Sequence, residues 1–306
     1  MQNAVLSLER ATEMDSSFQP ARIDLIHGYL NQALWGYLSP DAAAGRARHQ
    51  AEILVAAGDS TRSLWAALGW IQFFYDRDLE AAAKSLKDTC SSGYDPLAFR
   101  YSSRFHLGQG QFSQAIDLLR DAKAADPYSA AVQTSLAWAY HMAGDTRSAL
   151  AQAEEVIGLF PAHPMTLVFC SRVLAAAGLP GDRLTERATE LATQVVLSRP
   201  NFDSGISVLA YTYARHGRIE EARKLIERQV NLGRERFIMR SGLAPALVSL
   251  GEFDKAIQEL SHGERDRCPW FLELLYDPRL QPLHGKPEFQ RLQGIAQSMG
   301  ATTSAA

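Results

Sequence analysis

The sequence predicts an all-α solenoid: antiparallel helix pairs stacked in about 6–7 units and closed by a C-terminal capping segment. Two series of residues carry this prediction. The glycines have steps of 34, 34, 39 and 34 residues: Gly110, Gly144, Gly178, Gly217 and Gly251. The alanines that follow them have steps of 34, 39, 34 and 34 residues: Ala115, Ala149, Ala188, Ala222 and Ala256. A fixed period of this size indicates stacked copies of one supersecondary unit.

Composition narrows the class of protein. With 46% hydrophobic and 21% charged residues, the chain is globular rather than disordered. A net charge of −3 argues against direct binding of nucleic acid. Cys90, Cys170 and Cys268 are too widely spaced for a disulfide framework or a zinc site. The start of the chain does not resemble a signal peptide, and no apolar run is long enough to insert into a membrane, so we expect a cytoplasmic protein.

Residues 130–161 show how one unit is built. Apolar residues at spacings of three and four predict two helices, each with one apolar face. Gly144 can take the left-handed conformation that ends the first helix, and Asp145 or Thr146 can cap the second. Pro161 ends the second helix. The short turn makes the two helices antiparallel.

Residues 110–115, 217–222 and 251–256 repeat this turn. Each has an apolar residue two positions after the glycine and an alanine five positions after it. The alanine is expected where helices meet closely, because a larger side chain would overpack the contact. The single long step is explained by residues 179–183, a five-residue insertion that lengthens one turn.

The chain is expected to be one domain, divided into a half unit (1–16), divergent units (20–95), regular units (96–268), and a cap with a flexible tail (269–306). Within the divergent part, residues 22–35 and 41–57 form a further helix pair, and Arg77 replaces the turn glycine. Residues 8–16 repeat the spacing of residues 119–127, which places Met1 inside the second helix of a unit. We therefore expect a segment or relic of a longer protein, with the half unit as a candidate surface for self-association.

The glycine and alanine pattern resembles the tetratricopeptide repeat (TPR) family, most specifically over residues 96–268. Trp65, Leu68 and Gly69 stand where the family prefers a large aromatic residue, leucine and glycine. The resemblance implies a right-handed superhelix whose first helices line a concave groove. It also implies a protein that binds other proteins.

The end of the chain carries a second resemblance. Residues 276–283 and 286–292, together with residues 37–42 and 74–78, are similar to the C-terminal TPR tails of bacterial winged-helix transcriptional regulators and class III adenylate cyclases. Residues 269–275 can pack on the last unit as a cap. Neither a winged helix nor a cyclase domain is found, so DNA binding and cyclisation are not implied.

No set of residues predicts catalysis. Residues 108–110 look like the start of a phosphate loop but lack a third glycine and a preceding strand. His262 and Cys268 have no second pair to complete a metal site. The basic stretch 215–240 is interpreted as a solvated helix face rather than a phosphate site. We expect no enzymatic activity, no cofactor and no metal.

The predicted groove is the better candidate site. First-helix residues off the packing stripe are expected to point into it: Trp70, Phe73, Arg100, Arg104, Thr134, Trp138, His141, Arg172, Ser207, Tyr211 and Arg215. Aromatic rings beside guanidinium groups suit a peptide with acidic and apolar side chains. The alternative is that the aromatic residues only pack between helices and the arginines only solubilise.

The sequence therefore predicts a non-catalytic scaffold that binds a peptide or partner protein in its groove, in bacterial signalling or regulation. The alternative is a sensor module of a transcriptional regulator or an adenylate cyclase that binds a small-molecule or protein signal.

Overall fold

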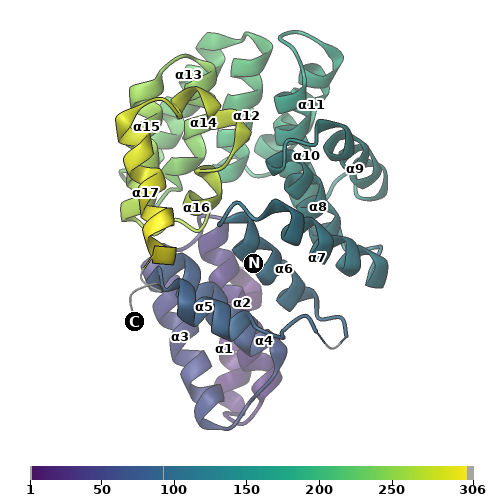
Figure 1. The fold of residues 1–306 in the computed structure, drawn as a ribbon, viewed down its shortest axis with the longest axis vertical. Helices are drawn as coiled ribbons and strands as arrows, with labels where there is room; N and C mark the ends of the chain where they lie inside the picture. The colour runs from purple at the N-terminus through teal and green to yellow at the C-terminus, as the bar shows by residue number, and fades with distance from the viewer. Residues whose placement is uncertain (1, 92, 302–306) are drawn as a thin grey trace.

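The computed structural model describes residues 2–91 and 93–301, and the secondary structure of this part of the chain is entirely helical. The helices stack into a curved superhelix (Figure 1). The predicted all-α solenoid is confirmed. Residues 302–306, the end of the expected flexible tail, lie outside the described residues.

The half unit is α1 (Gln2–Met14), and seven helix pairs follow it in the described residues. The first three pairs are α2 (Gln19–Leu34) with α3 (Pro40–Ala56), α4 (Arg62–Ile71, continued by the π-helix η1, Gln72–Asp76) with α5 (Leu79–Leu86), and α6 (Pro96–Leu107) with α7 (Phe112–Ala125). The next three are α8 (Ala130–Met142) with α9 (Thr146–Leu159), α10 (Pro164–Ala177) with α11 (Arg183–Ser198), and α12 (Asp203–His216) with α13 (Ile219–Leu232). The last pair is α14 (Ala244–Ser249, preceded by the 3₁₀ helix η2, Arg240–Leu243) with α15 (Phe253–Arg265). The chain continues through α16 (Phe271–Leu274), the 3₁₀ helix η3 (Pro278–Leu283) and α17 (Pro287–Ala301).

The turn between the helices of a pair follows the predicted chemistry. Gly144 has a φ of 75°, in the left-handed region, and the Asp145 side chain caps α9 by accepting from the Ser148 N–H. Gly178 is an exception: its backbone is extended, and Gly181 inside the inserted residues takes the left-handed conformation instead. Arg77 has a φ of 62°, so it occupies the backbone position that glycine holds in the regular turns.

The repeated alanines lie at buried positions on the second helices of five units. All five are fully or almost fully buried: Ala115, Ala149, Ala188, Ala222 and Ala256. Their burial agrees with the prediction that a small residue is needed at these positions.

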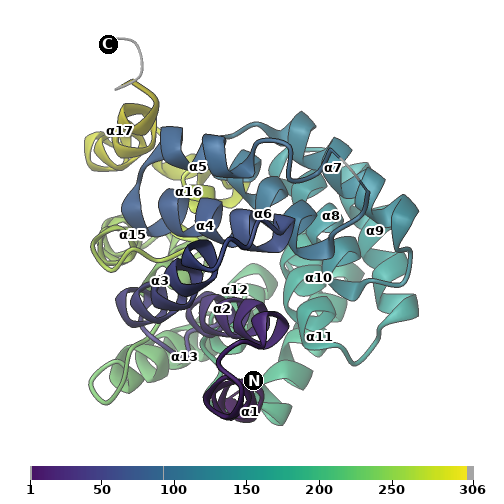
Figure 2. The same cartoon turned by 90° about the horizontal axis from the view of Figure 1, so that it is seen from below.

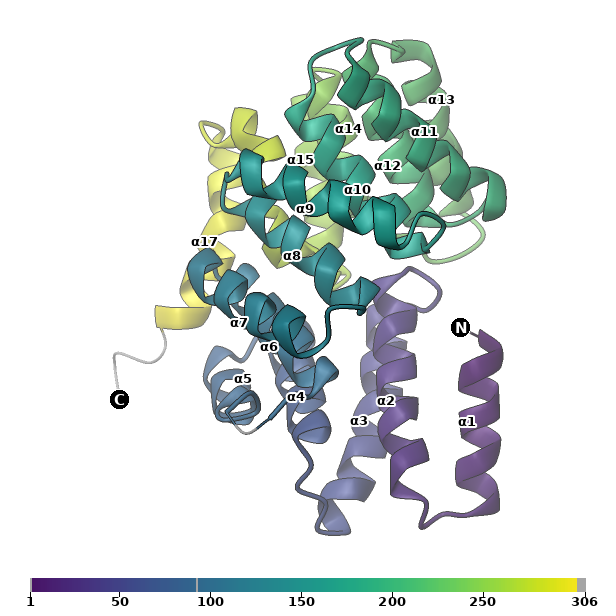
Figure 3. The same cartoon turned by 90° about the vertical axis from the view of Figure 1, so that its right-hand side faces the viewer.

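The superhelix curls far enough to bring distant units together. The Trp35 ring, just after α2, lies 5.5 Å from the Phe202 ring, just before α12. Trp270 donates a hydrogen bond from its indole nitrogen to the Leu34 carbonyl at 2.8 Å. Figures 2 and 3 show the first helices beside the later turn of the coil, and α17 contacts both α15 and α5. The C-terminal residues thus connect units that are far apart in sequence.

Candidate binding site on the concave face

The concave face of the superhelix is covered by part of the same chain. We call residues 269–283, which contain α16 and η3, the inner segment (Figure 1). Most of its side chains are buried: Trp270, Phe271, Leu272, Glu273, Leu274, Leu275, Asp277, Leu280 and Leu283. The groove expected from the sequence is therefore filled by the chain itself over much of its length.

Local backbone signals direct the inner segment inward. Arg267, after the end of α15, takes a left-handed conformation with a φ of 52°, which reverses the chain. Asp277 then caps η3 by accepting from the Arg279 N–H, and Pro278 occupies the first helical position. Proline is favoured there because its missing N–H needs no partner.

Glu273 is held by two of the predicted groove residues. An Nη2 atom of Arg104 lies 2.6 Å from Glu273 Oε1, and the Trp138 indole donates to Oε2 at 3.2 Å. Burial raises the pKa of Glu273 to about 7, although the Arg104 charge opposes that rise. Burial also lowers the pKa of Arg104. The ion pair thus offsets only part of the desolvation that both partners undergo.

Asp277 is the second carboxylate on the concave face. Its Oδ2 lies 2.5 Å from Arg279 Nη2, and its Oδ1 lies 3.5 Å from His141 Nε2. Burial on its own would raise the pKa of Asp277, but Arg279 and His141 hold it well below its usual range. The Arg279 guanidinium is also 5.0 Å from the centre of the Tyr211 ring. Asp277 is therefore ionised and fully paired.

Arg172 and Arg215 are placed differently. The Arg172 guanidinium lies among aromatic rings, 5.3 Å from the centre of Phe169 and 5.4 Å from that of Trp270. Arg215 donates to the carbonyls of Ala175 and Gly178, so it satisfies the C-terminal end of α10. These arginines do not simply solubilise the surface, which was the alternative interpretation.

The other predicted residues belong to the packing of the helices. Trp70 and Phe73 are buried in the main core. Thr134 bonds the Ala130 carbonyl of its own helix, and Arg100 donates to the Asn31 side chain at 2.9 Å. Ser207 donates to Gln229. The inner segment therefore unites part of the predicted set: Arg104, Trp138, His141, Arg172 and Tyr211.

The residues that fill the groove were not predicted from the sequence. Glu273 and Asp277 were assigned only to a cap. A signal was available: Glu273 stands inside an otherwise apolar run, and a carboxylate buried with such a run needs a cationic partner. The partner arginines were predicted to face the groove, so pairing the two observations would have found the contact.

Part of the concave face remains open as a cleft of about 460 Å³, bounded by α8, α9, α10, α12, α14 and η3. We call it the inner cleft. It contains three predicted groove residues, His141, Tyr211 and Arg215, and it also contains Arg279 and Ser249. Its walls are otherwise mainly small and apolar. The inner cleft is concave and combines apolar walls with cationic groups, which are features typical of binding sites.

Two further features are absent from the described residues. No group of three or more histidine, cysteine, aspartate and glutamate side chains there is placed to hold a metal ion. None of the described helices combines the length and apolar character needed to cross a membrane.

The fold and the concave face define an α-helical repeat protein. Residues 106–164, from the end of α6 to the start of α10, match the family model described as a tetratricopeptide repeat. The predicted resemblance to TPR proteins is therefore supported. No curated protein matches the chain. The similarity to regulator and cyclase tails stays a prediction.

Several solved structures are similar in fold. Pseudomonas aeruginosa pilF has 14% identity and a TM-score of 0.47, with 90% of this chain and 96% of that chain covered. A tetratricopeptide repeat protein from Parabacteroides merdae has 16% identity and a TM-score of 0.45, with 76% and 92% covered. A thermophilic TPR protein of Thermus thermophilus has 19% identity and a TM-score of 0.42, with 58% and 98% covered. We draw no functional conclusion from these likenesses.

Proposed function

We propose that this chain is a non-catalytic scaffold that binds a segment of a partner protein in the inner cleft. The observation that carries the proposal is the position of this cleft. It lies on the concave face directly beside the inner segment, which contributes Arg279 to it, and it shares His141 and Tyr211 with the surface that the inner segment covers. The partner segment would extend the same binding surface.

The chemistry of the partner is inferred from what the concave face already holds. The inner segment buries two carboxylates, Glu273 and Asp277, and a series of leucine and aromatic side chains. The adjoining inner cleft offers Arg215 and Arg279 beside apolar walls. A partner segment with acidic and apolar residues therefore suits it, because a carboxylate beside a guanidinium makes a charge-assisted hydrogen bond.

The inner segment itself is a permanent part of the fold rather than an exchangeable ligand. Displacing it would expose its whole row of buried leucine and aromatic residues. Each such side chain contributes roughly 1.5–3 kcal/mol when it is fully buried. A partner would have to replace all of these contacts, so we place the partner in the inner cleft and not beneath the inner segment.

The test fills the inner cleft without disturbing the core. Ala176→Trp adds bulk at a half-buried position of the cleft wall, and Ala151→Trp adds the same bulk at an exposed position on α9. Proteins crosslinked to the wild type in cell extract would be identified by mass spectrometry. We expect Ala151→Trp to retain the partner and Ala176→Trp to lose it at an unchanged melting temperature. Full retention by a folded Ala176→Trp variant would rule out the inner cleft.

A role in bacterial signalling or regulation is part of this proposal, supported by the resemblance of residues 276–292 to regulator and cyclase tails. A second candidate function is a sensor module that binds a small-molecule signal, and it is favoured by the volume of the inner cleft, about 460 Å³, which is in the range of small-molecule sites.

A further inference from the structure

The turn between α10 and α11 carries the inserted residues 179–183, which account for the single long step of the repeat, and it adjoins the inner cleft. Ala176 and Ala177, which shortly precede the insertion, line the cleft. Arg215 also lines the cleft, and its Nη2 donates to the Gly178 carbonyl at 2.6 Å. The inserted residues therefore begin at the edge of the inner cleft.

The inserted turn has a defined shape. The Asp182 carboxylate accepts from the Leu179 N–H at 2.7 Å and from the Thr185 N–H at 2.8 Å, so it closes the turn and caps α11. The Leu179 carbonyl accepts from the Asp182 N–H at 3.1 Å. Gly181 takes the left-handed conformation within the turn. Local hydrogen bonds thus fix the backbone of Leu179 on both sides.

Leu179 extends from this fixed turn into solvent and is 70% exposed. Within the described residues, the hydrogen bonds of residues 179–183 all stay between positions 179 and 186. A side chain added at Gly181 would meet no described atom within 4 Å. The insertion therefore adds little to the packing of the units. Loops held on a rigid scaffold are where binding residues are most often found.

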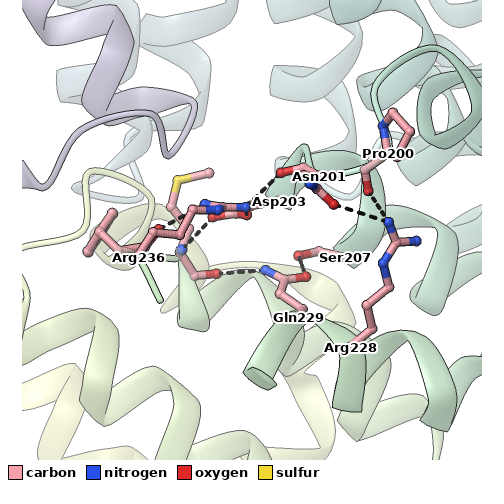
Figure 4. Close-up of polar contacts among 9 residues, drawn as sticks. Pro200, Asn201, Asp203, Ser207, Arg228, Gln229 and Arg236 are labelled. Atoms are coloured by element: carbon pink, nitrogen blue, oxygen red, sulfur yellow. Dashed lines mark hydrogen bonds and ion pairs between the residues drawn. The ribbon is translucent and has the colours of Figure 1, made fainter. Parts of the chain in front are cut away.

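The turn at the other end of α11 is held in a different way (Figure 4). Arg228 of α13 donates to the Pro200 carbonyl at 2.6 Å, and Arg236 donates to the Asn201 carbonyl at 2.7 Å. Phe202, at the end of that turn, is buried. Side chains from other elements therefore hold the α11–α12 turn and make it part of the fold, whereas residues 179–183 are held by their own hydrogen bonds.

The inner cleft beside the inserted turn is cationic. The described residues that line it include Arg215 and Arg279 and no aspartate or glutamate. The buried Asp277 offsets the charge of Arg279. Arg215, in contrast, bonds to main-chain carbonyls and to no carboxylate within the described part of the chain. A carboxylate of a ligand is therefore favoured on the Arg215 side of the cleft, which is the side next to the inserted turn.

We propose that the inserted turn forms the outer edge of the binding site, and that Leu179 contacts an apolar side chain of a partner segment whose acidic residue lies in the cleft near Arg215. This inference rests on the proposed scaffold function and specifies the partner, an extended segment in which an acidic residue and an apolar residue lie close together. A small molecule confined to the cleft would not need Leu179. The same residue therefore distinguishes the scaffold from the sensor.

The probes are linear peptides selected on the full chain from a random phage-displayed library. Peptides that the Ala176→Trp variant no longer binds are those that occupy the inner cleft. We expect these peptides to combine an acidic with an apolar residue, and Leu179→Ser to weaken their binding about tenfold at an unchanged melting temperature. Leu179→Met keeps an apolar side chain and should bind as the wild type does. Leu197→Ser is the matched control, because Leu197 is 76% exposed near the far end of α11, and it should also leave binding unchanged.

A double-mutant cycle tests the contact itself. Alanine in place of the apolar residue of the peptide should weaken binding to the wild type about tenfold, and it should add little when it is combined with Leu179→Ser. Unchanged affinity of folded Leu179→Ser for the cleft-binding peptides, or fully additive effects in the cycle, would overturn this inference and leave the proposed function standing. If Ala176→Trp binds every selected peptide, the inner cleft is not the binding site and both proposals fail.

Discussion

At the scale of the residue, the repeated alanines set how closely the helices approach. Ala149 is about 1% exposed, whereas Glu155 is on the outside of the same helix and pairs with Lys123. We expect Ala149→Trp to destabilise the protein by roughly 1–3 kcal/mol or more, because it overpacks the contact. Glu155→Ala should cost about 1 kcal/mol or less, because it removes an exposed ion pair. Urea unfolding of both variants measures the difference, and equal midpoints would contradict the repeat register.

Arg77 departs from the repeat, because it stands at the turn position that glycine holds in the regular units. Its backbone is left-handed, and its guanidinium nitrogens are buried without a hydrogen-bond partner among the described residues. A residue with a side chain pays a steric penalty of about 1 kcal/mol in this conformation, and glycine does not. We expect Arg77→Gly to raise the free energy of unfolding, despite losing the contact with the Phe271 ring. Arg77→Ala is the control: it removes the same charge and keeps the backbone penalty, so it should be less stable than the glycine variant.

At the scale of the element, most of the fold could be predicted from the sequence, and particular residues show why. Gly144, Asp145 and Ala149 lie close together in the sequence, at the turn before α9 and in its first residues, so local chemistry fixes their positions. The path of the inner segment could not be predicted in this way. Its position depends on pairs such as Glu273 with Trp138, which are far apart in the chain, and no local period reports such a contact. Register placed some of the predicted groove residues, such as Arg104 and Trp138, beside the inner segment, but the segment that covers them was not predicted.

The inner segment also makes stability depend on pH through Glu273. The folded-state pKa of Glu273 is raised to about 7, from 4.5 in a free chain. Between pH 4.5 and pH 7 the folded protein therefore binds more protons than the unfolded chain. The contribution of Glu273 to the free energy of unfolding is fully present below pH 4.5 and is lost as the pH rises through 7.

As the pH rises from 5 to 8, we expect the free energy of unfolding to fall less in Glu273→Gln than in the wild type, by on the order of 2–3 kcal/mol. Urea unfolding of both proteins at each pH measures this difference. Glu155→Gln changes an exposed carboxylate in the same way and should leave the wild-type pH profile unaltered. Parallel profiles for the wild type and Glu273→Gln would show that Glu273 does not titrate in this range.

At the scale of the whole molecule, Trp270 joins three distant parts of the superhelix. Its indole nitrogen bonds the Leu34 carbonyl at 2.8 Å, its ring lies 5.7 Å from the Phe169 ring, and the Arg104 guanidinium is 3.9 Å from its centre. A solenoid whose units touched only their neighbours would have no such residue. Contacts made by this one side chain of the inner segment therefore contribute to the closure of the coil.

We expect Trp270→Ala to destabilise the protein by roughly 3–5 kcal/mol and to open the coil. The radius of gyration from small-angle X-ray scattering should increase, and amide exchange should accelerate at residues 34–39, where the α2–α3 turn meets α12. Trp65→Ala is the matched control, because Trp65 is 38% exposed on α4. It should change neither measurement. If Trp270→Ala stays folded with an unchanged radius and exchange rate, the coil is closed by the stacking of the units alone, and Trp270 only fills space within it.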